Sequence, residues 1–188
     1  KLRRRAWTGV ALFLVYTGVE VTVGAWSYTL LTAGRGIAES PAAIGVGLFW
    51  GALTGGRLFF GFFGDRWKAH GVVTAMLTTA ATGAVLLLQP WSAAAALVSL
   101  PLLGFAFAPL FPFFVTLTPH VVGHEQSSRI IGFQVASANI GSAFIPLMVG
   151  ASVEILSLEA VAYMVALLTV LLTVIYRMWM SAETEHST

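Results

Sequence analysis

Residues Phe49–Gly71 read FWGALTGGRLFFGFFGDRWKAHG, an apolar helical run that ends in a charged turn. Glycines recur every four residues in this run and just before it, at Gly47, Gly51 and Gly55. Small residues at this spacing let a second helix approach closely, as helices in a bilayer require. The stretch therefore predicts a membrane-spanning helix that is packed against a close neighbour.

Arg57 lies inside this apolar run, about eight residues or ~12 Å before the charged end. At that depth the guanidinium would sit within the hydrocarbon, where a charge is costly and is by default a functional candidate. A structural alternative stays open, because a long arginine side chain can extend to the membrane interface or bind helix-end carbonyls.

The composition indicates that the whole chain belongs in a membrane. Of 188 residues, 57% are hydrophobic and 10% are charged, and the mean hydropathy is +0.85, whereas soluble domains are about 25% charged. There are no cysteines, which excludes disulfides and thiolate chemistry. The net charge of +2 comes from basic residues scattered over separate loops. We therefore expect the lipid bilayer, and not nucleic acid, as a partner.

Apolar runs near the ~20 residues that a bilayer core demands occur six times. They predict an all-α fold of six spanning helices, over residues 6–32, 43–64, 71–88, 93–117, 129–152 and 158–180, with a polar tail over 181–188. Thr118–Ser128 is expected to be a polar loop. Prolines are expected to kink the fourth helix, at Pro101, Pro109 and Pro112.

Six spans place both termini on one side of the membrane, and the basic residues divide accordingly. The terminal side would carry Lys1, Arg3, Arg4, Arg5, Arg66, Lys68, Arg129 and Arg177. The opposite side would carry Arg35 alone. Because cytoplasmic loops are enriched in lysine and arginine, we expect both termini in the cytoplasm.

Glu20 is the other ionisable residue inside a span, about fourteen residues or ~21 Å along the first helix. It could line a polar cavity that binds substrate or a proton, or it could be a protonated carboxyl bonded to a neighbouring helix. On this scale Glu20 and Arg57 differ in height by ~9 Å. A direct ion pair is therefore allowed, but it is not the arrangement that we expect.

Two helical faces supply further cavity candidates. Tyr16 and Ser27 lie on or near the face of Glu20 by three- and four-residue spacing, and Trp26 could border the same cavity. In the fifth helix the candidates are Gln134 and Asn139, and the alternative is interhelical hydrogen bonding, worth about 0.6 kcal/mol on average. The phenylalanines of the fourth helix could line a pathway, but contact with lipid is the default expectation for them; they are Phe105, Phe107, Phe111, Phe113 and Phe114.

The sequence contains no catalytic constellation. A phosphate-binding glycine loop is absent, and His124-Glu125 lacks the second histidine of a zinc motif. Asp65 is the only aspartate, which excludes an intramembrane aspartate pair. We therefore expect no enzyme activity, no cofactor and no metal site.

The motif Gly61-Phe-Phe-Gly-Asp65-Arg66, between the second and third spans, resembles the cytoplasmic signature loop of the major facilitator superfamily. Trp67-Lys68-Ala69-His70 departs from the family pattern, which has a glycine and further basic residues there. That departure is similar to the degenerate copy in the second half of family members. The resemblance implies a gating loop formed by Gly61, Asp65 and Arg66.

Further motifs extend the resemblance over nearly all 188 residues. They look like helices seven to twelve of fucose-permease-like members, and they are Gly18-x-Glu20 with Trp26, Trp50-Gly-x-x-x-Gly-Gly-Arg57, Ala108-Pro-Leu-Phe-Pro112, Gly132-Phe-Gln134, Asn139-x-Gly141 and Pro146. The chain is therefore expected to be the C-terminal six-helix half of a twelve-helix transporter, with an N-terminal six-helix half as its partner.

The resemblance implies secondary active transport by alternating access, in a half built from two inverted three-helix repeats. It implies a sugar or similar small polar solute as substrate, proton coupling, and location in the plasma or inner membrane. Efflux of an apolar drug-like compound is an alternative. A six-helix membrane scaffold subunit without transport activity is another.

Overall fold

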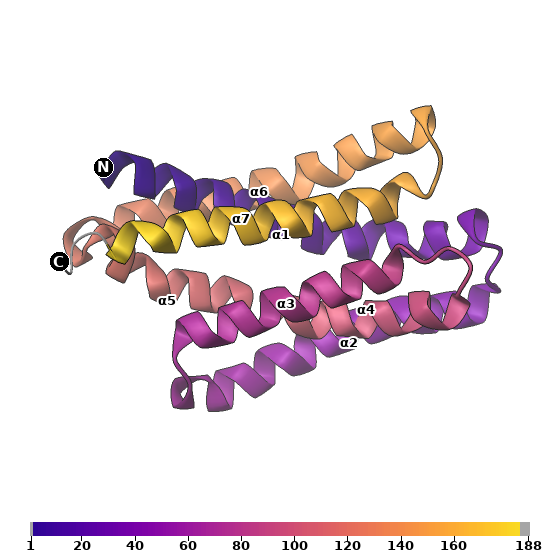
Figure 1. Cartoon of the computed structure of the whole chain (residues 1–188), viewed down its shortest axis with the longest axis horizontal. Helices are drawn as coiled ribbons and strands as arrows, with labels where there is room; N and C mark the ends of the chain where they lie inside the picture. The colour runs from indigo at the N-terminus through magenta and orange to yellow at the C-terminus, as the bar shows by residue number, and fades with distance from the viewer. Residues whose placement is uncertain (1, 185–188) are drawn as a thin grey trace.

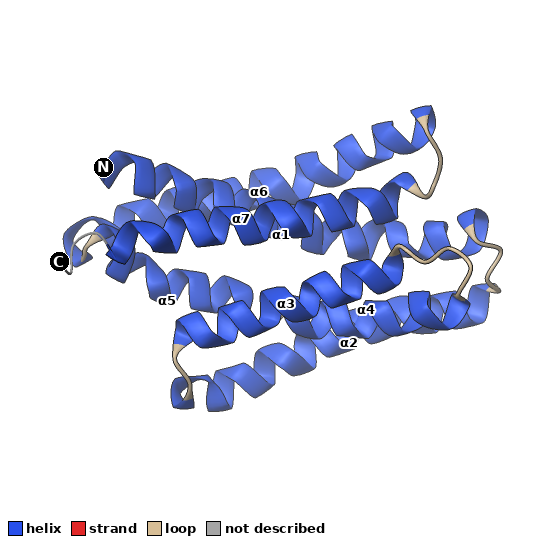
Figure 2. Ribbon diagram, in the orientation of Figure 1, coloured by secondary structure: helices blue, strands red, loops and turns tan. Residues whose placement is uncertain are grey.

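The computed structural model describes residues 2–184, and its regular structure there is entirely helical (Figures 1 and 2). In chain order the elements are α1 (Leu2–Thr29), the π-helical turn η1 (Leu30–Gly34), α2 (Glu39–Phe63), the 3-10 turn η2 (Gly64–Arg66), α3 (Ala69–Leu87), α4 (Ala93–Phe107), α5 (Leu110–Val122), α6 (His124–Ile155) and α7 (Ala160–Thr184). Six helical segments within the described residues are long and apolar enough to cross a membrane. The expected all-α fold with six spanning helices is confirmed.

The connection before α6 is much shorter than the sequence suggested. Thr118–Ser128 was expected to be a loop, which is wrong: α5 runs to Val122 and α6 begins at His124. Gly123 alone makes the corner, with φ of 86°, a left-handed conformation that glycine adopts without a steric penalty. Polar residues at the ends of a spanning helix therefore continue the helix, because its backbone hydrogen bonds do not depend on apolar side chains.

Pro109 divides the fourth span into α4 and α5. The amide of Ala108 still bonds to the carbonyls of Gly104 and Phe105, but Pro109 has no N–H with which to continue the ladder. Pro101 lies inside α4 without ending it. The break therefore falls at one of the three expected positions.

Each three-helix repeat is completed by the other. Helix α1 packs mainly against α6 and α7, and α4 packs mainly against α2 and α3 (Figure 1). The first span of each repeat is thus held between the second and third spans of the opposite repeat. This exchange is consistent with two inverted three-helix repeats, and it joins all six spans into one bundle.

Two glycines permit the closest helix crossings. A Cβ on Gly141 of α6 would lie 2.0 Å from the Leu14 carbonyl oxygen of α1, and a Cβ on Gly104 of α4 would lie 2.2 Å from the Phe49 carbonyl oxygen of α2. The expected stripe of Gly47, Gly51 and Gly55 does not pack in this way, since nothing lies within 4 Å of an added Cβ at any of them. Four-residue spacing places glycines on one face but does not say what that face meets.

Arg35 and the chain termini lie at opposite ends of the bundle. The start of α1 and the end of α7 lie at the same end, which we call the terminal end (Figure 1). At the opposite end Arg35 donates from Nε and Nη2 to Glu159, at 2.8 and 2.7 Å, and from Nη2 to the Leu87 carbonyl at 2.7 Å. Arg35 thereby ties the loop after η1 to the ends of α3 and α7.

We predict that Gly141→Ala destabilises the bundle, because its methyl group would meet backbone that cannot rotate away. Overpacking of this kind costs about 1–3 kcal/mol, or roughly 5 °C in the apparent melting temperature. The measurement is thermal unfolding in detergent micelles, followed by tryptophan fluorescence. Gly51→Ala is the matched control and should leave the melting temperature unchanged or slightly raised. Equal melting temperatures for the two variants would contradict the assigned crossing.

Candidate functional site

Three of the candidate residues meet inside the bundle. Tyr16 and Glu20 lie on successive turns of α1, and Arg57 reaches them from α2. The Arg57 Nη2 donates to Glu20 Oε1 at 3.0 Å and lies 3.3 Å from Oε2, while the Tyr16 hydroxyl donates to the same carboxylate. One carboxylate therefore accepts hydrogen bonds from two helices at once.

The ion pair between Glu20 and Arg57 is the arrangement that we had not expected from helix heights. That estimate took the charged ends of the first two spans as level. Figure 1 shows the turn between α2 and α3 set back toward the middle of the bundle, relative to the start of α1. The offset brings Arg57 toward the level of Glu20, and the long arginine side chain covers the remaining distance.

The break in the fourth span adds a backbone group to this site. The Tyr16 hydroxyl oxygen lies 3.1 Å from the carbonyl oxygen of Phe107, the last residue of α4. A hydroxyl has one proton, so Tyr16 donates either to that carbonyl or to Glu20. The site therefore connects α1, α2 and the α4–α5 break through one hydroxyl and one carboxylate.

Aromatic side chains of the fourth span surround Tyr16. Its ring centroid lies 5.8 Å from that of Phe114 and 6.3 Å from those of Phe107 and Phe111. Phe107 and Phe114 are fully buried, so the expectation that the fourth-span phenylalanines contact lipid is wrong for both. Composition could not reveal this, because lipid and a bundle core accept the same apolar side chains.

The two partners of the ion pair differ in solvent exposure: the carboxylate is covered and the cation is partly exposed. The side chain of Glu20 is 10% exposed and that of Arg57 is 49% exposed. The Nε and Nη1 atoms of Arg57 make no hydrogen bond to a residue that the structure describes. Arg57 can therefore bind a second group without leaving Glu20.

The other two candidates of α1 lie farther along that helix and differ in their surroundings. Ser27 is buried, and its hydroxyl has no partner among residues 2–184. The Trp26 indole donates to the Pro146 carbonyl of α6 at 3.1 Å, and its ring lies against Gly150. Ser27 thus keeps a free hydrogen-bonding group, whereas the indole N–H of Trp26 is used in helix packing.

The candidates of the fifth span do not join Glu20. Gln134 is fully buried and accepts a hydrogen bond from Thr118 of α5 at 3.0 Å. Asn139 is exposed on α6 and donates to the Val135 carbonyl of its own helix at 3.0 Å. Gln134 therefore joins two helices, and Asn139 belongs to a face of α6 that the described residues leave uncovered.

The signature loop makes few contacts within the chain. Gly61, Asp65 and Arg66 are exposed, and the guanidinium carbon of Arg66 lies 4.9 Å from the Phe63 ring centroid. No ion pair joins Asp65 to a residue that the structure describes. A gating contact of this loop would therefore need a partner outside residues 2–184.

Comparison with known families identifies the superfamily to which the chain belongs. The family model described as Major Facilitator Superfamily matches residues 8–188, which include Tyr16, Glu20, Arg57 and the signature loop. A search of curated proteins returns no match. The superfamily inferred from sequence is confirmed, while the fucose-permease-like subtype and the assignment to a C-terminal half stay predictions.

We predict that Glu20 and Arg57 are energetically coupled. Glu20→Gln leaves the guanidinium without its counter-charge, so adding Arg57→Gln should cost less than it does in the wild type. The expected coupling is about 1 kcal/mol or more, discounted for the exposure of Arg57. Thermal unfolding of the two single variants and the double variant measures it. Glu20→Gln combined with Arg66→Gln is the control and should be additive; an additive result for Glu20 and Arg57 would contradict the coupling.

Proposed function

Because the chain belongs to the major facilitator superfamily, we propose that it is the C-terminal half of a secondary active transporter for a small polar solute, such as a sugar. The chain is an integral membrane protein with six spanning helices. The observation that carries the proposal is an intramembrane ion pair with a covered carboxylate and a half-exposed guanidinium. Tyr16, Glu20 and Arg57 would form the substrate and proton site.

The ion pair offers a route to proton coupling. With Glu20 ionised, its charge-assisted hydrogen bonds occupy part of the Arg57 guanidinium. When Glu20 takes up a proton, that attraction is lost, and the guanidinium donors become available to the oxygen atoms of a solute. Uptake of a proton would then favour uptake of solute, and the Tyr16 hydroxyl could turn from Glu20 to the Phe107 carbonyl.

Of the remaining candidates, two have polar groups that could contact a bound solute. Ser27 has an unpaired buried hydroxyl on the Glu20 side of α1, and Asn139 lies on the uncovered face of α6. We assign Trp26 and Gln134 to the rigid frame, because the Trp26 indole N–H and the Gln134 side-chain oxygen bond to neighbouring helices. The polar site therefore runs along α1 and α2, while Asn139 lies on a separate, uncovered face of α6.

An N-terminal six-helix half would cover what this chain leaves open. Exposed side chains on α2 include Leu48, Trp50 and Leu58, and on α6 they include Ile140, Phe144 and Leu147. Between two halves, the exposed loop residues Gly61, Asp65 and Arg66 could make the gating contacts that this chain lacks. In the plasma or inner membrane, the arginines Arg3, Arg4, Arg5, Arg66, Arg129 and Arg177 at the terminal end favour a cytoplasmic location for both termini.

We prefer a polar solute to an apolar drug-like compound. The fourth-span phenylalanines that would suit an apolar compound surround Tyr16 inside the bundle, and Phe107 and Phe114 are inaccessible. Near the site, α2 exposes the guanidinium of Arg57 and the small residues Thr54 and Gly55, together with the apolar side chains of Leu58 and Phe59. We base the preference for a polar solute on the guanidinium, which is the charged group open beside Glu20. A non-transporting scaffold would give no role to a half-open intramembrane ion pair.

The prediction is that Glu20→Gln uncouples transport from the proton gradient. The full-length protein is reconstituted into liposomes and tested with a panel of radiolabelled monosaccharides, first with an imposed pH gradient and then by exchange at equal pH. Glu20→Gln should lose gradient-driven accumulation and keep exchange, because it mimics the protonated carboxyl. Arg57→Gln should lower both by roughly tenfold to a hundredfold, the worth of one or two charge-assisted hydrogen bonds.

Glu154→Gln removes an exposed carboxylate of α6 and is the matched control, expected to behave as the wild type. Gradient-driven accumulation that survives Glu20→Gln would refute the coupling role. If the correctly folded wild type transported none of the monosaccharides, sugars would be rejected as the substrate class.

A further inference from the structure

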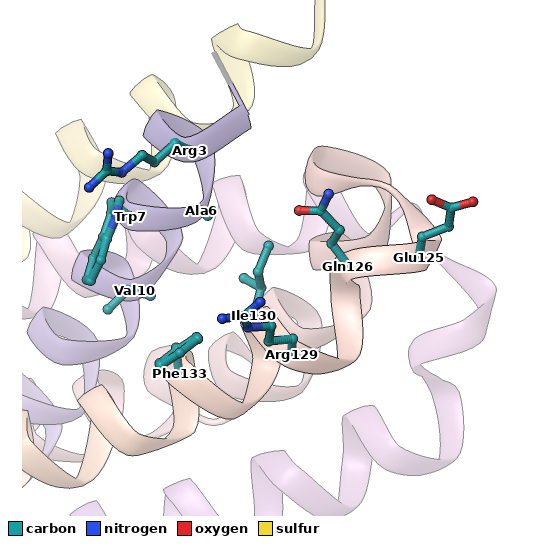
Figure 3. A pocket seen from close by; sticks show the side chains of 9 residues that line it. All are labelled: Arg3, Ala6, Trp7, Val10, Glu125, Gln126, Arg129, Ile130 and Phe133. Carbon is teal, nitrogen blue, oxygen red and sulfur yellow. The ribbon is translucent and has the colours of Figure 1, made fainter.

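A groove of about 690 Å³ lies between α1 and α6 at the terminal end (Figure 3). Its α1 wall runs from Arg3 to Val10 and its α6 wall from Glu125 to Phe133, so it does not include Tyr16, Glu20 or Arg57. Its volume is typical of a small-molecule site, about 300–1,000 Å³. Below it the two helices touch, since Ser137 donates to the Val10 carbonyl at 2.9 Å. The groove is therefore a wedge that is closed at its inner end.

Both walls change from charged to apolar over a similar distance. Along α1 the wall passes from Arg3 to Trp7 and Val10, and along α6 it passes from Gln126 and Arg129 to Phe133. Seven residues separate Arg3 from Val10 and eight separate Glu125 from Phe133, or ~10–12 Å of helix axis. The headgroup layer on each side of a bilayer is about 5–8 Å thick. A ligand of this groove must therefore be polar at one end and apolar at the other.

The polar part of the groove is cationic. Neither Arg3 nor Arg129 forms an ion pair with a residue that the structure describes. Glu125 is the acidic residue of the wall, and Figure 3 shows its carboxylate pointing away from both guanidinium groups. Helices α1 and α6 also begin at this end, so the positive ends of their dipoles add to the same field.

The apolar part of the groove is open to a ligand. Trp7 is 60% exposed and Phe133 is 52% exposed, and the Arg129 guanidinium carbon lies 5.9 Å from the Phe133 ring centroid. Aromatic rings at this depth favour the boundary between headgroups and acyl chains. A soluble anion could use the arginines but would leave both rings uncovered.

We propose that this groove binds one anionic phospholipid, with its phosphate between Arg3 and Arg129 and its acyl chains along Trp7 and Phe133. Guanidinium groups suit phosphate oxygens because they can donate two parallel hydrogen bonds. Basic pockets between spanning helices are a known form of headgroup site. The bound lipid bridges the first and fifth spans above their contact at Val10, and this role does not depend on the proposed transport function.

The test is native mass spectrometry of the full-length protein in detergent, with dioleoyl-phosphatidylglycerol or dioleoyl-phosphatidylcholine added. The wild type should hold one phosphatidylglycerol in preference to phosphatidylcholine. Arg3→Gln with Arg129→Gln should weaken that binding by roughly tenfold or more. Lys68→Gln with Arg177→Gln removes the same charge at the terminal end outside the groove, and should leave the binding unchanged. All four side chains are exposed, so both pairs should fold.

A second measurement locates the lipid independently of charge. Brominated phosphatidylglycerol should quench the tryptophan fluorescence of the wild type, and Trp7→Phe should remove part of that quenching. Equal weakening of phosphatidylglycerol binding by the Arg3/Arg129 variant and by the Lys68/Arg177 variant would overturn the proposal in favour of diffuse surface attraction. The proposal would also be overturned if the wild type showed no preference for either lipid. That result is expected if another part of the protein fills the groove.

Discussion

Hydrocarbon supplies no hydrogen-bond partners, and this constraint explains most of the polar contacts in the bundle. Buried hydroxyls bond to backbone carbonyls, either within a helix, as Thr22 does to Gly18, or across helices, as Ser137 does to Val10. Among residues 2–184, the buried side-chain atoms without a partner belong to Ser27, Arg35, Gln134 and Trp179. A polar group without a hydrogen-bond partner therefore marks a candidate binding site, because nearly all other buried polar groups have a partner.

The two ion pairs obey this constraint in different ways. Arg35 and Glu159 form a bidentate pair in which the arginine side chain is 3% exposed, and a helix-end carbonyl takes a further hydrogen bond. Glu20 and Arg57 form a pair in which the carboxylate is covered and the cation is 49% exposed. The first pair fastens the end of the bundle. The second pair holds a charge at an open face, which a frame alone would not require.

The sequence predicted the six spans and the superfamily, because apolar run length and the signature-loop spacing are local properties. It also singled out Tyr16 by its four-residue spacing from Glu20, and it singled out Glu20 and Arg57 separately, since charge within a span is rare. It did not predict their contact. Contact depends on how far each helix is shifted along its axis, and that shift is set by crossings such as Gly141 on Leu14, which no single helix encodes.

The same limit explains the glycine stripe and the terminal groove. Gly51 and Gly55 have helix-packing spacing but face open space, because a pattern on one helix does not identify the surface opposite it. The groove needs Arg3 and Arg129, which are more than a hundred residues apart and belong to spans that α1–α6 packing makes neighbours. Both features lie on surfaces that this chain leaves uncovered, whereas its core is closed. In the two proposals made above, these surfaces are covered from outside, the groove by a lipid and the α2 face by a second half of the transporter.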